Sequence, residues 1–226
     1  MSKPLVSRPK LKGGHESDHF QTPDYATKSI VPFLRAAGVR TIWECAAGRG
    51  IMARCFEREG FEVIATDILT GYDFFQTPIT HNFDAIVTNI PFSLKVEFFK
   101  RAYQIGKPFA FLNPITIEGQ LCRMFARYGM QEITPIQRIH YLTPEQLKSG
   151  LDYYWRCSNM NCKQVYRIAE SPKACLECDG NCFEKLKYTS HIKTVWHTHG
   201  LNLKSDRVYI DLAENGYPDQ GDWRIK

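Results

Sequence analysis

The chain alternates short apolar segments with amphipathic ones from about residue 20 to residue 142, and this rhythm limits the folds open to it. Strand-like runs occupy 40–46, 61–68, 83–88, 108–114 and 136–142. Helical patterns lie before and between them, at 22–38, 49–60, 93–106 and 117–129. Strands that alternate with helices of this length predict βαβ units. We therefore expect an α/β fold with a mostly parallel sheet and helices on both faces.

The rhythm breaks in a segment rich in Cys, Lys and Asn, and two strand-like runs, 191–199 and 206–212, then return to the sheet. This break divides the chain into parts. The expected parts are a flexible basic arm (1–19), a main domain (20–151 and 189–212), a cysteine-rich insert (152–188) and a peripheral tail (213–226).

Composition says more about the cellular location of the protein than about its function. The 226 residues carry a formal net charge of +5, which is compatible with a polyanionic partner without requiring one. No stretch approaches the roughly 20 apolar residues of a membrane span. The first residues are basic and lack an apolar core, so they do not resemble a secretory signal. We expect a cytoplasmic protein that is not bound to a membrane.

Five of the eight cysteines crowd into the insert. Without a secretory signal, such crowding favours metal binding over disulfides. Two pairs have zinc-like spacing, and the expected ligands of a closed structural zinc site are Cys157, Cys162, Cys175 and Cys178. Cys182 is an alternative to either member of the second pair, and His191, His197 and His199 are less economical ligands. The competing interpretation is a set of free thiols.

The insert also interleaves cationic and aromatic side chains, including Arg156, Lys163, Tyr154 and Trp155. Cations suit phosphates and aromatic rings suit bases, so the insert is a candidate for recognition of nucleic acid. A structural brace or a dimer contact is the alternative.

Small residues follow the first strand in the stretch WECAAGRG (43–50). They allow a backbone to approach a ligand at the carboxyl end of that strand, where open α/β sheets bind ligands. The next strand ends at Asp67, an acid placed to accept hydrogen bonds from ribose hydroxyls. Asp73 and Phe74 farther on suit an adenine ring. Each feature alone is more often structural, but their order and spacing reinforce one another.

The run FDAIVTNIPF (83–92) ends a buried strand with an amide, a proline and an aromatic residue. One interpretation is a strand-to-helix turn with a buried ring. The other is a site that holds a flat, nitrogen-bearing ring, and its position downstream of ECAAGRG favours this second interpretation.

The order of ECAAGRG, ATDI, DFF and TNIPF resembles the S-adenosyl-L-methionine-dependent amino-methyltransferases. With FQTPDYATKSIVPFL upstream and NPITIEGQ downstream, the chain looks most similar to small phage- and prophage-type adenine-specific DNA methyltransferases. The resemblance covers about residues 20–142. It implies a Rossmann-like methyltransferase fold in a bacterial or phage-infected cell.

The resemblance also implies roles for individual residues. S-adenosyl-L-methionine would be the cofactor, with one group of residues beside its methionine part, ribose and adenine. That group is Thr22, Pro23, Glu44, Ala46, Gly48, Asp67, Ile68, Asp73, Phe74 and Asn89. The expected catalytic residues are Asn89, Ile90, Pro91 and Phe92.

The chemistry of adenine explains why such a motif would be needed. The exocyclic amine is a poor nucleophile, because its lone pair is delocalised into the ring. The Asn89 side-chain carbonyl and the Ile90 backbone carbonyl, aimed by the fixed φ of Pro91, would accept its two hydrogens. Phe92 would stack on the base, which in duplex DNA must first be flipped out of the helix.

The substrate has alternatives. The commonest adenine motif has Pro where this chain has Ile90, and Asn-Ile-Pro-aromatic also resembles adenine dimethyltransferases of ribosomal RNA. DNA is favoured over RNA, and the glutamine amide of a protein is a minor alternative. Methylation at a cytosine carbon is disfavoured, because the chain has no Pro-Cys pair. A non-catalytic module that binds cofactor or nucleic acid is the competing function, and intact Glu44, Asp67 and Asn89 favour the enzyme.

Overall fold

A computed structural model describes residues 21–76, 78, 80, 82–139, 141, 154–157, 165–167, 174, 178, 183–186 and 193–215. Its main feature is a seven-stranded sheet in the order β10-β5-β9-β4-β3-β1-β2. The strands are β1 (Thr41–Glu44), β2 (Glu62–Ala65), β3 (Ala85–Asn89), β4 (Phe109–Pro114), β5 (Gln131–Pro135), β9 (Thr194–His199) and β10 (Arg207–Ile210). All neighbouring pairs are parallel except those of β9, which runs antiparallel to β4 and β5. The predicted mixed α/β fold with a mostly parallel sheet is confirmed.

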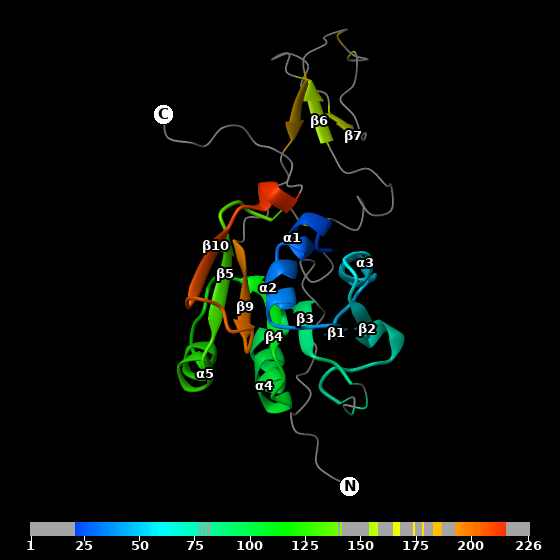
Figure 1. Ribbon diagram of the computed structural model, residues 1–226. Coiled ribbons are helices and arrows are strands. Elements are labelled where there is room, and N and C mark those ends of the chain that lie inside the picture. The colour runs from blue at the N-terminus through cyan, green and yellow to red at the C-terminus, as the bar shows by residue number, and fades with distance from the viewer. Residues whose placement is uncertain are drawn as a thin grey trace.

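Helices lie against both faces of this sheet (Figure 1). One face is covered by α1 (Asp24–Lys28), α2 (Val31–Ala36) and α3 (Ile51–Arg58). The other is covered by α4 (Lys95–Ile105) and α5 (Gln120–Tyr128). Short 3-10 turns are η2 (Ile68–Thr70), η3 (Phe92–Leu94) and η4 (Leu212–Asn215).

Successive residues of the central strands alternate between two apolar cores. In β4, Ala110 and Leu112 join the core under α1–α3, while Phe109 and Phe111 join the core under α4 and α5. All four side chains are fully buried. A strand covered on both faces is apolar at every position, which explains its continuous apolar sequence.

The chain reverses its direction of progress across the sheet at β1, which pairs with β2 on one side and β3 on the other. Such a switch point leaves a crevice beyond the carboxyl ends of the two strands, because the connecting helices leave on opposite faces. The stretch WECAAGRG and the NIPF motif both follow strands that end at this edge.

The helix expected over 22–38 is two helices in the structure. Helix α1 ends at Lys28, and α2 begins at Val31 with Pro32 in its first turn. Proline has no N–H to continue a helix, so the break falls just before it. Pro23 is the N-cap residue of α1.

The strand expected over 136–142 lies earlier in the chain, as β5 (Gln131–Pro135). The prediction followed the apolar residues Ile136, Ile139 and Tyr141. Glu132 is only 2% exposed and forms part of the strand. Two of the three apolar residues, Ile139 and Tyr141, are buried outside any strand.

The insert contributes a separate three-stranded antiparallel sheet in the order β7-β6-β8. Its strands are β6 (Tyr154–Cys157), β7 (Val165–Arg167) and β8 (Phe183–Leu186). The expected domain boundaries stay a prediction. None of the helices in the described ranges has the length and apolarity needed to cross a bilayer.

The segment between α1 and α2 is tied to the centre of the sheet by one buried hydrogen bond. Trp196 Nε1 on β9 donates to Ser29 Oγ at 3.0 Å, and both residues are almost fully buried. We expect Ser29→Ala to lower the free energy of unfolding by about 1–3 kcal/mol, because the indole N–H then has no acceptor. Ser205→Ala, which removes only an exposed hydrogen bond, should change it by less than about 0.5 kcal/mol. Urea denaturation of both variants measures the difference, and equal values would contradict this role.

Candidate functional site

The loops that follow β1 and β2 are joined by the carboxylate of Asp67. Its Oδ2 accepts a hydrogen bond from Gly48 N at 2.7 Å, and its Oδ1 accepts one from Leu69 N at 2.8 Å. Asp67 is 8% exposed. The acid expected at the end of the second strand therefore fixes the backbone of the glycine loop against η2.

Two glycines give this loop its shape. Gly48 has φ +54° and Gly50, the N-cap of α3, has φ +73°, in the region that side chains with a Cβ rarely adopt. A Cβ on Gly48 would also lie 3.0 Å from Nε2 of Gln21. The loop thus depends on glycine at both positions, and it packs closely against the residue before Thr22.

Glu44 is a buried acid at the end of β1. It is 2% exposed, and burial raises the pKa of its carboxyl group from 4.5 to about 8, with Asp67 adding to the increase. Its Oε2 is buried and has no hydrogen-bond partner among the described residues. This oxygen can accept a hydrogen bond from a ligand, and a cationic donor would favour the ionised form.

The NIPF motif forms a tight turn at the end of β3. Ile90 is buried, and its N–H donates to Leu112 O at 3.3 Å. Pro91 has φ −56° and precedes η3, whose first residue is the half-buried Phe92. Asn89 Oδ1 is buried, and no described residue donates to it. The turn therefore holds, at the sheet edge, an amide oxygen that is free to accept a hydrogen bond.

Buried polar atoms without a partner gather at this edge. Within the described ranges, seven side-chain atoms are buried without a hydrogen bond, and five belong to residues at the carboxyl ends of β1, β3 and β4 or beside the glycine loop. These five are Thr22 Oγ1, Glu44 Oε2, Thr88 Oγ1, Asn89 Oδ1 and Asn113 Oδ1. Buried polar groups are normally paired, so this concentration indicates a place where a ligand or ordered water completes the structure.

The other expected site residues have varied surroundings. Ile68 is 48% exposed next to Asp67, as a residue that packs on a ligand would be before binding. Asp73 Oδ1 accepts from Phe75 N. Phe74 is 4% exposed, with its ring 4.9 Å from Phe98 and 5.3 Å from Trp43, so most of its surface is in the core. The roles of these residues toward a cofactor stay predictions, as do those of Thr22, Pro23 and Ala46.

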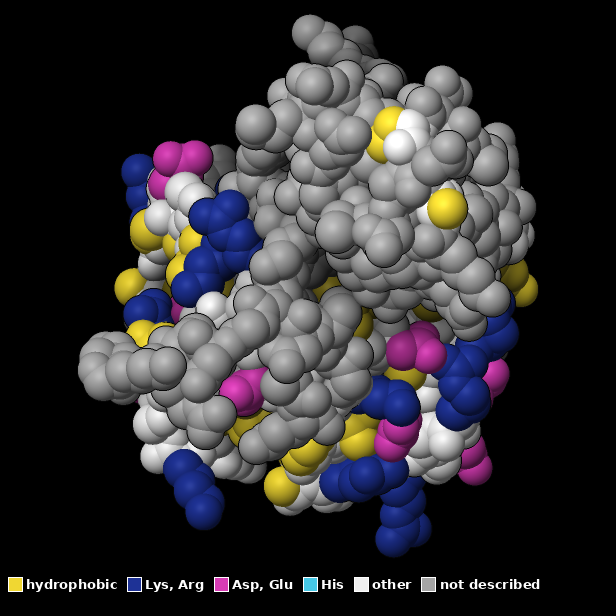
Figure 2. Space-filling model, turned by 90° about the horizontal axis from the view of Figure 1, so that it is seen from above, with side chains coloured by type: hydrophobic (Ala, Val, Ile, Leu, Met, Phe, Trp, Pro, Cys, Tyr) yellow, Lys and Arg dark blue, Asp and Glu magenta, His cyan; other side chains and the backbone are white. Residues whose placement is uncertain are grey.

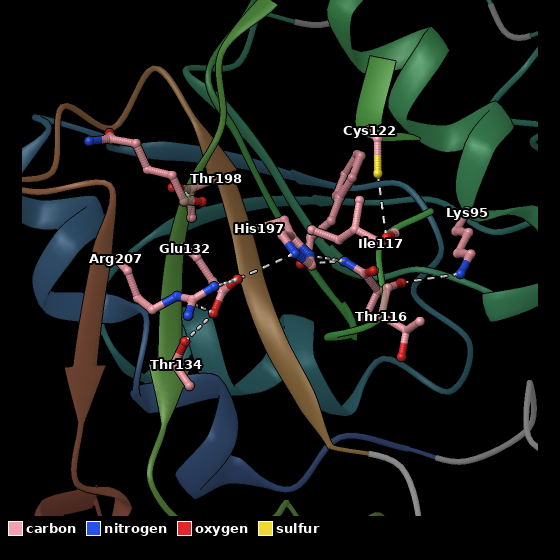
Figure 3. Close-up of polar contacts among 12 residues, drawn as sticks. Lys95, Thr116, Ile117, Cys122, Glu132, Thr134, His197, Thr198 and Arg207 are labelled. Atoms are coloured by element: carbon pink, nitrogen blue, oxygen red, sulfur yellow. Dashed lines mark hydrogen bonds and ion pairs between the residues drawn. The ribbon is translucent and has the colours of Figure 1, made fainter. Parts of the chain in front are cut away.

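A row of four polar side chains on the α4 and α5 face, three of them buried and the fourth, Arg207, 52% exposed, was not expected from the sequence. It runs from Asn113 on β4 through His197 on β9 and Glu132 on β5 to Arg207 on β10 (Figure 3). Burial lowers the pKa of His197 to about 3, so the ring is neutral at physiological pH. The local sequence carries no clear signal, because Glu132 is flanked by Gln131 and Ile133, with Thr134 next.

Of the four expected zinc ligands, only Cys178 has a described side chain, and it is half-buried. Cys162 and Cys175 lie outside the described residues, as does the side chain of Cys157. Among the residues that are described, no group of three or more His, Cys, Asp or Glu side chains could hold a metal ion. His197, considered as a spare ligand, belongs to the seven-stranded sheet, where its Nδ1 contacts Asn113. The zinc site stays a prediction.

The surface above the sheet carries both signs of charge. Figure 2 views the molecule from above Figure 1, the side on which η4 follows the carboxyl end of β10. Lys and Arg side chains lie on both sides of this view, interspersed with Asp and Glu. The charged side chains visible in this view therefore do not by themselves indicate that a polyanion binds there.

No family model and no curated protein matches the chain. Among solved structures, it is similar to the methyltransferase subunit of a type I restriction-modification system from Streptococcus thermophilus. The two share 14% sequence identity with a TM-score of 0.44, over 90% of this chain and 49% of that chain. The chain thus spans about half the length of that subunit, and a similarity of this size assigns no activity.

The buried carboxyl of Glu44 has a consequence for pH. The pKa of Glu44 is about 8 in the folded protein and 4.5 in the unfolded chain. Between these two pH values the folded state therefore holds one more proton than the unfolded state. Rising pH then favours the unfolded chain, by up to about 1.4 kcal/mol per pH unit. We expect Glu44→Gln to remove this fall in stability between pH 5 and pH 8.

Urea denaturation of wild type and Glu44→Gln across that range measures the effect. Glu118→Gln, which alters an exposed acid that does not contribute to the pKa of Glu44, is the control and should keep the wild-type slope. The same slope in wild type and Glu44→Gln would show that Glu44 is not buried with its proton.

Proposed function

We propose that the protein transfers a methyl group from S-adenosyl-L-methionine to the exocyclic amine of adenine in nucleic acid, with DNA favoured over RNA. One observation carries the proposal. Asn89 Oδ1 is a buried acceptor with no partner among the described residues, and it stands at the start of a proline-fixed turn beyond a parallel strand. An acceptor held in this way suits an amine that must be oriented rather than deprotonated.

The residues of the neighbouring loops fit the proposed cofactor. S-adenosyl-L-methionine, when bound, supplies a methyl group on a positively charged sulfur. Glu44 Oε2 is an unpaired acceptor that would take a hydrogen bond from the ammonium of the methionine part. Gly48 leaves room for a close approach of the backbone, and Asp67 keeps lone pairs for ribose hydroxyls beside the exposed Ile68.

The NIPF turn would hold the reacting amine. Asn89 Oδ1 and the Ile90 carbonyl oxygen would each accept one N–H, which draws the nitrogen toward a tetrahedral geometry and exposes its lone pair. Phe92 would hold the face of the base by stacking, worth about 1–3 kcal/mol. Positioning and fixed dipoles would supply most of the rate enhancement, and no general base is needed to begin the reaction.

A polymeric substrate requires the base to leave its stack. In duplex DNA the amine is paired, so an enzyme of this kind flips the nucleotide into its pocket. The net charge of +5 and the cationic, aromatic composition of the insert support a nucleic acid over a free nucleotide.

Asn89→Ala is expected to bind the cofactor with affinity close to wild type and to lose turnover by about 100-fold or more, because a transition-state acceptor is gone. Calorimetry measures cofactor binding. Labelled S-adenosyl-L-methionine, incubated separately with unmethylated DNA and total RNA, measures transfer after digestion and mass identification of the nucleosides. Asn82→Ala, an exposed amide seven residues earlier, should behave as wild type.

The assay has distinct outcomes. N6-methyladenine from DNA supports the proposal, whereas methyladenine from RNA alone would replace DNA with RNA as substrate. Wild-type protein that binds the cofactor but methylates neither would overturn it. Unchanged turnover in Asn89→Ala would remove the role given to this residue.

A further inference from the structure

The turn that contains the NIPF motif is attached at both of its ends to the end of β4. At one end, Ile90 N donates to Leu112 O at 3.3 Å. At the other end, Lys95 Nζ, from the first residue of α4, donates to Thr116 O at 3.4 Å. The placement of residues 90–95 therefore follows the placement of residues 112–116.

Asn113 anchors this supporting segment from within. It is 1% exposed, and its Nδ2 donates to Phe111 O at 3.2 Å and lies 2.8 Å from His197 Nδ1. An amide nitrogen can only donate, so His197 Nδ1 is the acceptor and the ring proton is on Nε2. Exchanging the oxygen and nitrogen of Asn113 would place two carbonyl oxygens together at Phe111, which supports the assignment.

The other side of the His197 ring is packed rather than hydrogen-bonded. The ring lies against Phe99 and Phe125, and its Nε2 is 3.8 Å from Glu132 Oε2 with no hydrogen-bond partner among the described residues. Arg207 approaches the Glu132 carboxylate through Nε at 3.1 Å and through Nη2 at 3.2 Å. Thr134 also donates to this carboxylate.

The register of the strands puts these groups in one line. His197 is paired with Phe111 on β4 and with Glu132 on β5, and Glu132 is paired with Arg207 on β10. Figure 3 shows Glu132 and Arg207 on one side of His197, with Thr116 and Lys95 on the other. These residues therefore lie in a line from β10, at the edge of the sheet, to residues 112–116, which support the turn.

The orientation of the Asn113 carboxamide follows from its neighbours. Its nitrogen is engaged by His197 on β9 and by its own strand. Its oxygen is buried without a partner in the described part of the chain, as is Thr88 Oγ1 on β3.

We propose that Asn113 and His197 are positioning residues for the amine-binding turn, held in place by their mutual hydrogen bond and by the packing of the ring against Phe99 and Phe125. The inference rests on the proposed function, because the position of that turn matters for activity only if the turn binds the amine. Neither residue contacts the substrate. A neutral imidazole that accepts at Nδ1 keeps the carboxamide in one orientation, and the end of β4 then keeps Ile90 and Lys95 in register.

His197→Phe tests this role, because it keeps a ring against Phe99 and Phe125 and removes the acceptor for Asn113. We expect kcat to fall about 10- to 100-fold, since a displacement of the turn misplaces the amine. KM and the Kd for cofactor should stay within about twofold. His197→Gln, whose side-chain oxygen can accept from Asn113, should recover most of the activity.

His199→Phe is the matched control. It makes the same change on the same strand and face, at the other end of β4, where His199 is paired with Phe109. It should leave kcat unchanged. A wild-type kcat in His197→Phe, or equal losses in both variants, would overturn the inference and leave His197 a core residue only.

Nuclear magnetic resonance tests the same inference without catalysis. The wild-type His197 ring should show an unprotonated Nδ1 and remain neutral from pH 5 to pH 8, and a protonated Nδ1 would overturn the assignment. The amide resonances of Asn89 and Ile90 should shift in His197→Phe and not in His199→Phe. If wild type methylates nothing but these shifts occur, the proposed function fails while the positioning role stands.

Discussion

A sheet that is covered on both faces has few places for an unpaired polar atom, and this constraint organises the molecule. The central strands alternate between two apolar cores, so a polar side chain within them must find a partner or weaken the fold. Strand ends are the places where this rule relaxes. The unpaired oxygens of Glu44, Asn89 and Asn113 stand at such ends, on three strands whose carboxyl ends share one edge. Each lowers stability until a ligand or water arrives, which is how a site is prepared in advance of its substrate.

The polar row on the α4 and α5 face meets the need for polar partners within the sheet itself rather than at a strand end. Glu132 and His197 lie inside the sheet, and each has a partner there or next to it. The neutral ring joins a charged pair on one side to an uncharged amide on the other. A charge near the edge strand is thus separated from the candidate site by an imidazole that does not titrate near neutral pH. Protonation of this ring therefore does not alter the field at the candidate site near neutral pH.

Periodicity predicted the parts of the fold in which local pattern and burial agree. Strands β1 to β4 and helices α3 to α5 lie within two or three residues of their expected ranges. The WECAAGRG loop and the NIPF turn were predicted because small residues and proline act through the local backbone. Strand β5 was misplaced because the charge of Glu132 is neutralised by Arg207, 75 residues away. The role of His197 was missed for the same reason. Its partner, Asn113, lies on another strand, so the residues next to His197 in the sequence give no signal of the contact.

Strand β9 gives the fold a modular character. Because it runs antiparallel between β4 and β5, the chain leaves the sheet at the carboxyl end of β5 and re-enters it at the same edge. The whole excursion between these strands therefore starts and finishes beside the candidate site. A segment inserted there can change in length or sequence without altering strand order, while its two ends stay at the sheet edge that holds the candidate site. Under the proposed function, recognition by the insert and chemistry at the sheet edge could then evolve separately.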